Sequence, residues 1–262
     1  MLPDFEIIQH QFYGGHDIRI IPLYDIHLGA QECMEQELIE FVNMVKETPN
    51  DYVILGGDLI DNGTRSSIAS PFSQKYRPSV QKREMANILE PIRDRILCII
   101  PGNHERRSGK DADDDPVYDI AVKLDIEHLY RENIAFLKIQ MGQANAKDGK
   151  VRPTYSLVVT HGAGGGILTG GAVNRSERFG YVIDGMDALI VGHTHKPYTT
   201  QPGKIYFDAH NNRVSVKPFK VISATSWLSY GGYAAQKMLL PSSHCLTKLI
   251  LCGKNKGMVV EM

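Results

Sequence analysis

The chain has 262 residues, of which 42% are hydrophobic and 23% are charged, and its formal net charge is −1. This length suits one α/β domain with a substantial core, so we expect a single domain over residues 1–262. No stretch reaches the roughly 20 consecutive apolar residues that a membrane span requires. A charge near zero gives no global attraction to nucleic acid, so a polyanionic substrate would have to meet a local basic patch.

The N-terminal segment and the cysteines both indicate the cytoplasm. Residues 1–17, MLPDFEIIQHQFYGGHD, contain acidic residues and lack the basic start and apolar block of a signal peptide. The four cysteines are scattered without a C-x-x-C pair, which argues against a zinc knuckle and against a redox dithiol. We therefore expect reduced thiols in a cytoplasmic protein.

Strands and helices alternate in the first half of the chain. The apolar run at 18–29 predicts a buried strand, and apolar residues at helical spacing follow at 35–48. The pattern then repeats, with a strand at 51–61, a helix at 80–96 and a strand at 97–105. Such alternation favours a largely parallel sheet with helices packed outside, and ligand sites in such folds lie at the carboxyl ends of the strands.

The second half adds more strands and one Gly-rich segment. Apolar runs at 155–162 and 187–195 both end in histidine, and residues 163–183 between them predict a flexible loop and a short helix. The glycines of that segment do not match a phosphate-binding spacing. The pattern at residues 214–223 predicts a strand, and the pattern at residues 245–262 predicts a hairpin around GKNKG.

Polar residues follow five of the predicted strands in the forms D-x-H, G-D-x-x-D, G-N-H-E, T-H-G and G-H-x-H. Any one of these motifs is weak, since two histidines one residue apart can simply form a polar pair at a sheet edge. Together they place many costly polar groups at one edge of a sheet, which is too many for structural coincidence. The residues are Asp25, His27, Asp58, Asp61, Asn103, His104, His161, His193 and His195.

This ordered set of motifs resembles that of the calcineurin-like metallophosphoesterase superfamily over roughly residues 18–200. The resemblance implies a two-layered β sandwich flanked by helices, whereas the strand and helix pattern alone predicts only an α/β fold. It also implies a two-metal centre. Carried over residue by residue, one metal would be held by Asp25, His27, Asp58 and His195, and the other by Asp58, Asn103, His161 and His193.

The chemistry of phosphoryl transfer explains this choice of ligands. A bridging carboxylate, here Asp58, can hold two cations roughly 3.5–4 Å apart, which lets them clamp the attacking and leaving oxygens. Imidazole mixed with carboxylate and amide oxygen suits Mn, Fe, Zn or Ni, and we expect two divalent transition-metal ions with Mn preferred. A metal-activated hydroxide would then be the nucleophile.

The resemblance gives His104 a catalytic part without metal ligation, in which it stabilises charge or protonates the leaving oxygen. Asp61 would orient this histidine, although it could instead cap the following turn DNGT. Glu105 matches the last letter of G-N-H-E, yet it could be an ordinary exposed carboxylate.

Two local features favour a DNA nuclease. The sequences DIHLG and GHTHKP resemble the bacterial exonuclease and double-strand-break nuclease branch, and GGDLIDNG lacks the arginine of the protein phosphatase form. The connection at 62–83 carries five basic residues without an acid, together with Phe72 and Tyr76, and could track a phosphate backbone and stack bases. It could equally be a solvated loop that offsets the acidic residues at 110–115.

We therefore predict hydrolysis of phosphodiester bonds in a nucleic acid or nucleotide substrate. The alternative within the enzyme class is a small-molecule phosphoesterase that acts on a cyclic nucleotide or a phosphomonoester. A non-catalytic interaction scaffold is disfavoured because every expected ligand and His104 are present. No segment suggests an arm for an ATPase partner, and we expect no membrane association.

Overall fold

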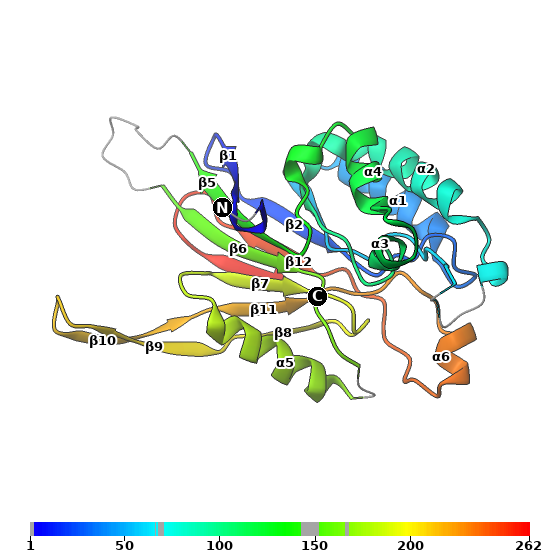
Figure 1. Cartoon of the computed structure of the whole chain (residues 1–262). Helices are drawn as coiled ribbons and strands as arrows, with labels where there is room; N and C mark the ends of the chain where they lie inside the picture. Colours follow the sequence, from blue (N-terminus) through cyan, green and yellow to red (C-terminus); the bar gives the residue numbers. More distant parts are fainter. Residues whose placement is uncertain (1–2, 66, 68–70, 143–151, 166–167) are drawn as a thin grey trace.

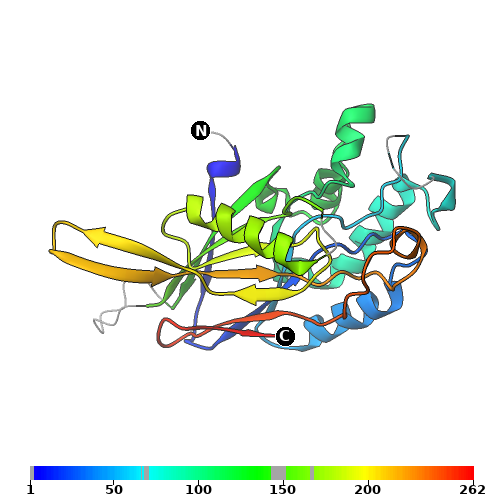
Figure 2. The same ribbon diagram turned by 90° about the horizontal axis from the view of Figure 1, so that it is seen from below.

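The computed structural model describes residues 3–65, 67, 71–142, 152–165 and 168–262. Its strands form two main sheets that pack face to face with helices on the outer sides (Figures 1 and 2). The 6-stranded sheet has the order β1-β5-β6-β7-β11-β8, and the 5-stranded sheet has the order β13-β12-β2-β3-β4. The expected α/β fold, a two-layered β sandwich flanked by helices, is confirmed.

The strands of the 6-stranded sheet are β1 (Ile7–Phe12), β5 (Ile134–Met141), β6 (Thr154–Thr160), β7 (Ala188–Val191), β11 (Lys220–Ser223) and β8 (Tyr198–Thr200). Those of the 5-stranded sheet are β13 (Met258–Glu261), β12 (Lys248–Leu251), β2 (Ile18–Leu23), β3 (Asp51–Leu55) and β4 (Ile96–Ile99). A separate pair consists of β9 (Gly203–Asp208) and β10 (Arg213–Pro218). The helices are α1 (Glu35–Glu47), α2 (Pro78–Leu89), α3 (Arg106–Ala112), α4 (Pro116–Lys123), α5 (Thr169–Val182) and α6 (Gly232–Gln236), with 3₁₀ turns η1 (Pro3–Phe5), η2 (Pro71–Ser73), η3 (Glu90–Arg95) and η4 (Glu127–Leu129).

Both main sheets are mixed, and the strands that carry the candidate site pair in parallel within each sheet. Strand β2 pairs with β3 and β3 with β4 in parallel, as do β6 with β7 and β7 with β11. The edge strand β1 also pairs with β5 in parallel, whereas the pairs β5–β6, β8–β11 and β2–β12 and the predicted β12–β13 hairpin are antiparallel. The expectation of a largely parallel sheet therefore holds for the strands that carry the candidate site.

Some helix predictions need correction. The helix predicted at 80–96 ends as α2 at Leu89, because Pro91 lacks the N–H that would continue it, and the chain tightens into η3. The predicted short helix between residues 163 and 183 is the 14-residue α5, and residues 166–167 of that segment lie outside the described residues. Within the described ranges, no helix is long and apolar enough to cross a membrane.

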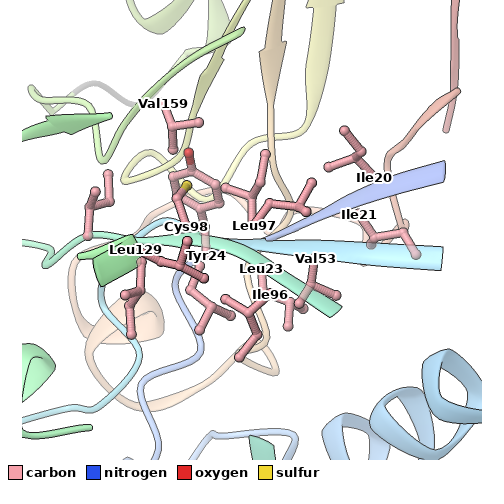
Figure 3. Close-up of a cluster of buried hydrophobic side chains, with 14 of the residues drawn as sticks. Ile20, Ile21, Leu23, Tyr24, Val53, Ile96, Leu97, Cys98, Leu129 and Val159 are labelled. Atoms are coloured by element: carbon pink, nitrogen blue, oxygen red, sulfur yellow. The ribbon is translucent and has the colours of Figure 1, made fainter. Parts of the chain in front are cut away.

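The core lies between the two sheets, and β2 contributes most of its residues to it. Ile20, Ile21, Leu23 and Tyr24 are fully buried, and Figure 3 shows them in one cluster with Leu97 and Cys98 of the β4 region. The Tyr24 hydroxyl donates a hydrogen bond of 3.2 Å to the carbonyl of Ile190 on β7, in the other sheet. This contact joins the two sheets directly below the strand ends that carry the candidate site.

Candidate metal centre

The structure brings together all nine polar residues that follow the predicted strands. They come from both sheets, because β2, β3 and β4 end beside the ends of β6 and β7 at the same edge of the sandwich. Asp25 and His27 follow β2, Asp58 and Asp61 follow β3, Asn103 and His104 follow β4, His161 follows β6, and His193 and His195 follow β7.

A first group of donor atoms converges from β2, β3 and β7. The Nε2 atom of His195 lies 3.5 Å from Oδ1 of Asp25 and 3.4 Å from Nε2 of His27. Nε2 of His27 lies 3.7 Å from Oδ2 of Asp58. These four side chains are the set that the resemblance assigned to one metal.

A second group shares the same oxygen of Asp58. Its Oδ2 atom lies 3.4 Å from Nε2 of His161, which is 3.1 Å from Oδ1 of Asn103. That amide oxygen is in turn 2.7 Å from Nδ1 of His193. Oδ2 of Asp58 therefore lies between the two groups, in the position that a bridging ligand requires.

The unpaired atoms of the centre fit metal ions. Oδ1 of Asp25 is buried and has no hydrogen-bond partner within the described part of the chain, while its Oδ2 accepts the backbone N–H of His193. Nδ1 of His161 lies 2.9 Å from the carbonyl of Gly56 and donates its proton there, so Nε2, which faces Asp58, is the atom that could bind a cation once its own proton is lost. A buried carboxylate oxygen without a partner is costly, and a cation would remove that cost.

Five of the seven candidate ligands have left-handed backbone conformations. The φ angles are 51° for Asp25, 51° for His27, 52° for Asp58, 68° for His193 and 56° for His195. Non-glycine residues rarely adopt such angles, and each one costs about 1–3 kcal/mol. Strain concentrated in this way is typical of functional sites, where the surrounding structure holds side chains in positions that the backbone alone disfavours.

Backbone hydrogen bonds and two motif glycines hold these strained turns. The N–H of Trp227 and the hydroxyl of Ser226 both donate to the Asp25 carbonyl, at 3.0 and 3.1 Å. A Cβ atom on Gly102 would lie 2.1 Å from Oδ1 of Asp58, and one on Gly192 would lie 2.9 Å from Oδ2 of Asp25. The glycines of G-N-H-E and G-H-x-H are therefore required, because the Asp58 carboxylate lies directly against Gly102 and both the Tyr24 ring and the Asp25 carboxylate lie against Gly192.

The charges of the centre favour cations. Burial on its own raises the pKa of Asp58, but His161, His104 and His27 hold it well below its usual range. Burial on its own lowers the pKa of His161, but the charge of Asp58 and a hydrogen bond to it raise that pKa to about 9. Burial, assisted by neighbouring histidines, lowers the pKa of His27 and of His193. The carboxylates are thus ionised at neutral pH, and a cation would compete with the proton of His161.

His104 lies at the rim of the centre, next to Asp61. Its Nδ1 atom is 2.8 Å from the Asp61 carbonyl and 3.3 Å from Oδ1 of the same residue, while its Nε2 lies 3.9 Å from Oδ2 of Asp58. Burial lowers the pKa of His104, yet the hydrogen bond to Asp61 and the charge of Asp58 outweigh it and raise that pKa. The same contacts hold the pKa of Asp61 far below its usual range, against the effect of burial.

Glu105 is not an exposed carboxylate, so that alternative is wrong. Its side chain is buried, and the residue is only 1% exposed. Oε2 accepts the backbone N–H groups of Asp58 and Gly102 at 3.0 and 2.8 Å, and Oε1 accepts that of Ile60 at 3.0 Å. Glu105 therefore fixes the turn that carries the shared ligand, and the last letter of G-N-H-E was the only sequence signal for it.

Asn62 is a supporting residue that the sequence motifs do not indicate. It is fully buried, and its side-chain amide donates to the His104 carbonyl at 2.8 Å and to the Ser108 hydroxyl at 2.9 Å. Its backbone N–H donates to Oε1 of Gln81 at 2.8 Å. In the sequence Asn62 looked like a turn residue, and only the packing of α2 and α3 beside it shows its role.

A family model described as calcineurin-like phosphoesterase matches residues 25–197, more than half of the chain. The chain belongs to the calcineurin-like phosphoesterase family. Membership makes it a hydrolase of phosphoester bonds, and the family depends on a dinuclear metal centre. The converging donor groups described above are where a chain of this family would hold such ions.

The chain also matches solved structures at low similarity, whereas no curated protein matches it. One is a conserved uncharacterized protein from Streptococcus pneumoniae TIGR4, described as a predicted phosphoesterase, with 9% identity, coverage of 95% of this chain and 100% of that chain, and a TM-score of 0.38. A metallophosphoesterase from Sphaerobacter thermophilus has 15% identity, coverage of 89% and 83%, and a TM-score of 0.39. An NAD nucleotidase from Haemophilus influenzae has 10% identity, coverage of 94% and 49%, and a TM-score of 0.43. Membership of the calcineurin-like phosphoesterase family therefore rests on the family model.

Proposed function

We propose that this calcineurin-like phosphoesterase is a phosphodiesterase with two divalent transition-metal ions, and that its substrate is DNA. The observation that carries the proposal is Oδ2 of Asp58, which lies 3.7 Å from the His27 imidazole and 3.4 Å from that of His161. One oxygen placed between two groups of nitrogen and oxygen donors suits a pair of cations that act on a single phosphate. A cytoplasmic location and a place in the bacterial nuclease branch are parts of the same proposal.

The side chains of the two donor groups would hold the ions. Mn²⁺ is the preferred ion, because imidazole, carboxylate and amide oxygen together suit Mn, Fe, Zn or Ni better than Mg. When bound, the pair supplies a low-pKa water as nucleophile and charge stabilisation for the phosphate. One ion would be held by Asp25, His27, Asp58 and His195, and the other by Asp58, Asn103, His161 and His193.

His104 would donate a proton to the leaving oxygen. Its Nδ1 is engaged by Asp61, so its Nε2 is the atom that faces the centre. Because Asp61 and Asp58 raise its pKa, a larger fraction of His104 is protonated near neutral pH than for an ordinary histidine. Asp61 thus acts as a positioning residue, and Asn62 holds the backbone of His104 from the other side.

Support for an extended phosphodiester comes from the end of the 62–83 connection. Lys75 donates its backbone N–H to the Gly29 carbonyl at 2.8 Å, and the Gln74 amide donates to Asp61, so this segment packs against the loops of the centre. Phe72, beside it, is 98% exposed and Lys75 is exposed as well. An exposed aromatic ring and a lysine beside a phosphate site suit base stacking and backbone binding.

The basic residues of this connection do not all serve that purpose. Lys82 forms ion pairs with Asp114 at 3.2 Å and with Asp119 at 2.5 Å, which matches the alternative that the connection offsets nearby acidic residues. Arg83 pairs with Glu84 at 3.0 Å. Residues 66 and 68–70 lie outside the described residues, so the nucleic-acid proposal rests on the segment from 71 to 77.

Arg175 is a further candidate for substrate binding. Together with Thr194, which stands between two candidate ligands, it lines a small hollow, and its guanidinium lies against Gly164. A planar guanidinium can donate two hydrogen bonds to one phosphate group. We assign Arg175 to a phosphate oxygen of the substrate.

The test compares a diester with a monoester. Protein stripped with a chelator and reloaded with Mn²⁺ is assayed on bis(p-nitrophenyl) phosphate and on p-nitrophenyl phosphate, followed by a single-stranded DNA oligonucleotide. We expect hydrolysis that requires the metal, a higher kcat/KM for the diester, and cleavage of the oligonucleotide. A preference for the monoester would overturn the diester assignment in favour of a small-molecule phosphatase. If the protein hydrolyses the small diester but leaves the DNA intact, the substrate would instead be a cyclic nucleotide.

Phe72→Ala tests the DNA assignment separately. We expect KM for the oligonucleotide to rise about 10-fold, the effect of losing one stacked base, while kinetics on bis(p-nitrophenyl) phosphate stay unchanged. The small diester is the internal control, because it carries no nucleotides beyond the reacting phosphate. An unchanged KM for DNA would remove Phe72 from the proposed binding site.

A further inference from the structure

A two-stranded arm leaves the sandwich at the end opposite the metal centre. The arm, residues 203–218, consists of β9 and β10, which pair in antiparallel fashion and belong to neither main sheet. Figures 1 and 2 both show it extending away from the strands β8 and β11. Strand β11 is parallel to β7, and the candidate ligands follow the C-terminal end of β7. The arm precedes β11 and joins its N-terminal end, which is therefore the end away from the metal centre.

One face of this arm is apolar and exposed. Val214 lies directly opposite Phe207, and Val216 lies directly opposite Ile205. Cross-strand partners share a face, and residues two apart on a strand do as well, so these four side chains form one continuous patch. Ile205 is 80% exposed, Phe207 71%, Val214 63% and Val216 67%.

The other face of the arm has its own partners. The Lys217 ammonium lies 3.1 Å from the centre of the Tyr206 ring, which covers that ring with a cation–π contact. Lys204 donates to the Ile183 carbonyl just after α5 and so ties the base of the arm to that helix. The two faces therefore differ in kind, since one face carries charged groups and the other is apolar and largely exposed.

A two-stranded ribbon of this type is marginally stable in water by itself. Its exposed apolar face lowers the stability further. The four side chains have roughly 100–200 Å² of surface each, and because most of that surface is exposed they present about 400 Å² to solvent. That is within the range in which a single apolar patch on a monomer marks an interaction site.

We propose that the apolar face of the arm binds the same face of a second copy of this chain. Two such faces remove about 800 Å² of side-chain surface from water, and the adjoining backbone brings the total near the roughly 1,000 Å² that a specific interface needs. A two-fold axis makes the patch its own complement, with the Phe207 ring of each copy against the aliphatic side chains of the other.

Charge supports this occupant as well. The patch itself carries no ionisable side chain, so bringing two copies together buries no like charges. The charged residues Lys204, Arg213 and Lys217 alternate with it and project from the opposite face. The dimer would therefore be insensitive to salt, in contrast to an arm that binds a nucleic acid.

The test measures the mass of the full chain by sedimentation velocity over about 1–100 μM. We expect a dimer for the wild type, and a monomer for the double variant Ile205→Lys/Phe207→Lys with metal content and hydrolysis per chain unchanged. Ser215→Lys adds a charge to the other face and is the matched control, which should remain dimeric. If the double variant fails to fold, replacement of residues 204–217 by a Gly-Ser-Gly turn serves instead and should also give a monomer.

Three results would overturn the proposal. A monomeric wild type at about 100 μM means that some other partner covers the face. A dimer that survives both the lysine substitutions and removal of the arm places the interface elsewhere. Loss of the dimer in Ser215→Lys as well as in the double variant means that the apolar face is not the contact.

Discussion

Glu105→Gln tests whether the buried carboxylate holds the turn of the shared ligand. The substitution keeps the volume of the side chain but leaves one acceptor oxygen. If that oxygen stays with the N–H groups of Asp58 and Gly102, the new amide group faces the N–H of Ile60, and one buried donor loses its acceptor. An unsatisfied buried donor costs about 1–3 kcal/mol, and the two remaining bonds weaken by about 0.5–1 kcal/mol each because their acceptor is no longer charged.

Part of this cost is offset by electrostatics. Burial, and then the charge of Asp58, raise the pKa of Glu105, so a neutral amide removes some repulsion. We therefore expect a net loss of about 2 kcal/mol in the free energy of unfolding, which lowers Tm by about 4–8 °C. Displacement of Asp58 should also lower the turnover of the diester by at least about 10-fold.

The assay is a thermal scan together with steady-state kinetics on bis(p-nitrophenyl) phosphate. Glu127→Gln is the matched control, because Glu127 is exposed and its change should stay within about 0.5 kcal/mol. A Tm for Glu105→Gln within about 1 °C of the wild type, with normal turnover, would refute the role of Glu105 in holding the turn.

Four further substitutions test the site and the fold. Asp25→Asn removes the charge of a buried oxygen without a partner, so we expect bound Mn²⁺ to fall by about 10-fold or more in elemental analysis; full occupancy would contradict ligation. His104→Ala should keep its metals but lose about 10²-fold in kcat, and metal loss would contradict a proton-donor role. Arg175→Ala should raise KM for the diester about 10-fold while Arg178→Ala, a solvent-exposed control one turn away on α5, leaves it unchanged; equal effects would exclude a specific phosphate contact. Burial lowers the pKa of His10 from its ordinary value of 6.5, so as the pH falls the unfolded chain takes up a proton on this residue at a higher pH than the folded chain does. The free energy of unfolding therefore decreases as the pH drops below 6.5. His10→Gln should therefore show a smaller loss of Tm between about pH 7.5 and pH 5.5 than the wild type, and an equal loss would contradict the shift.

The sequence predicted the candidate site better than it predicted the fold around it. All nine polar residues at the strand ends were identified from spacing, because an apolar strand that ends in Asp, Asn or His is a local pattern. The family membership follows from the same motifs. The strands β1, β5, β8 and β9 were not predicted, although the alternating burial of β5 shows that a signal was present.

What the sequence by itself determined is which residues could bind metals and which strands are buried, since both depend on side-chain type and on spacing within a few residues. The resemblance already implied that Asp58 is shared, and the tertiary structure places its Oδ2 between the two donor groups. Only the tertiary structure decided that Glu105 is buried beneath its turn and that five ligands have positive φ. It also separated β10 from β11 and so exposed the arm. These features depend on contacts between residues far apart in the chain, and local patterns carry no information about which distant groups will meet.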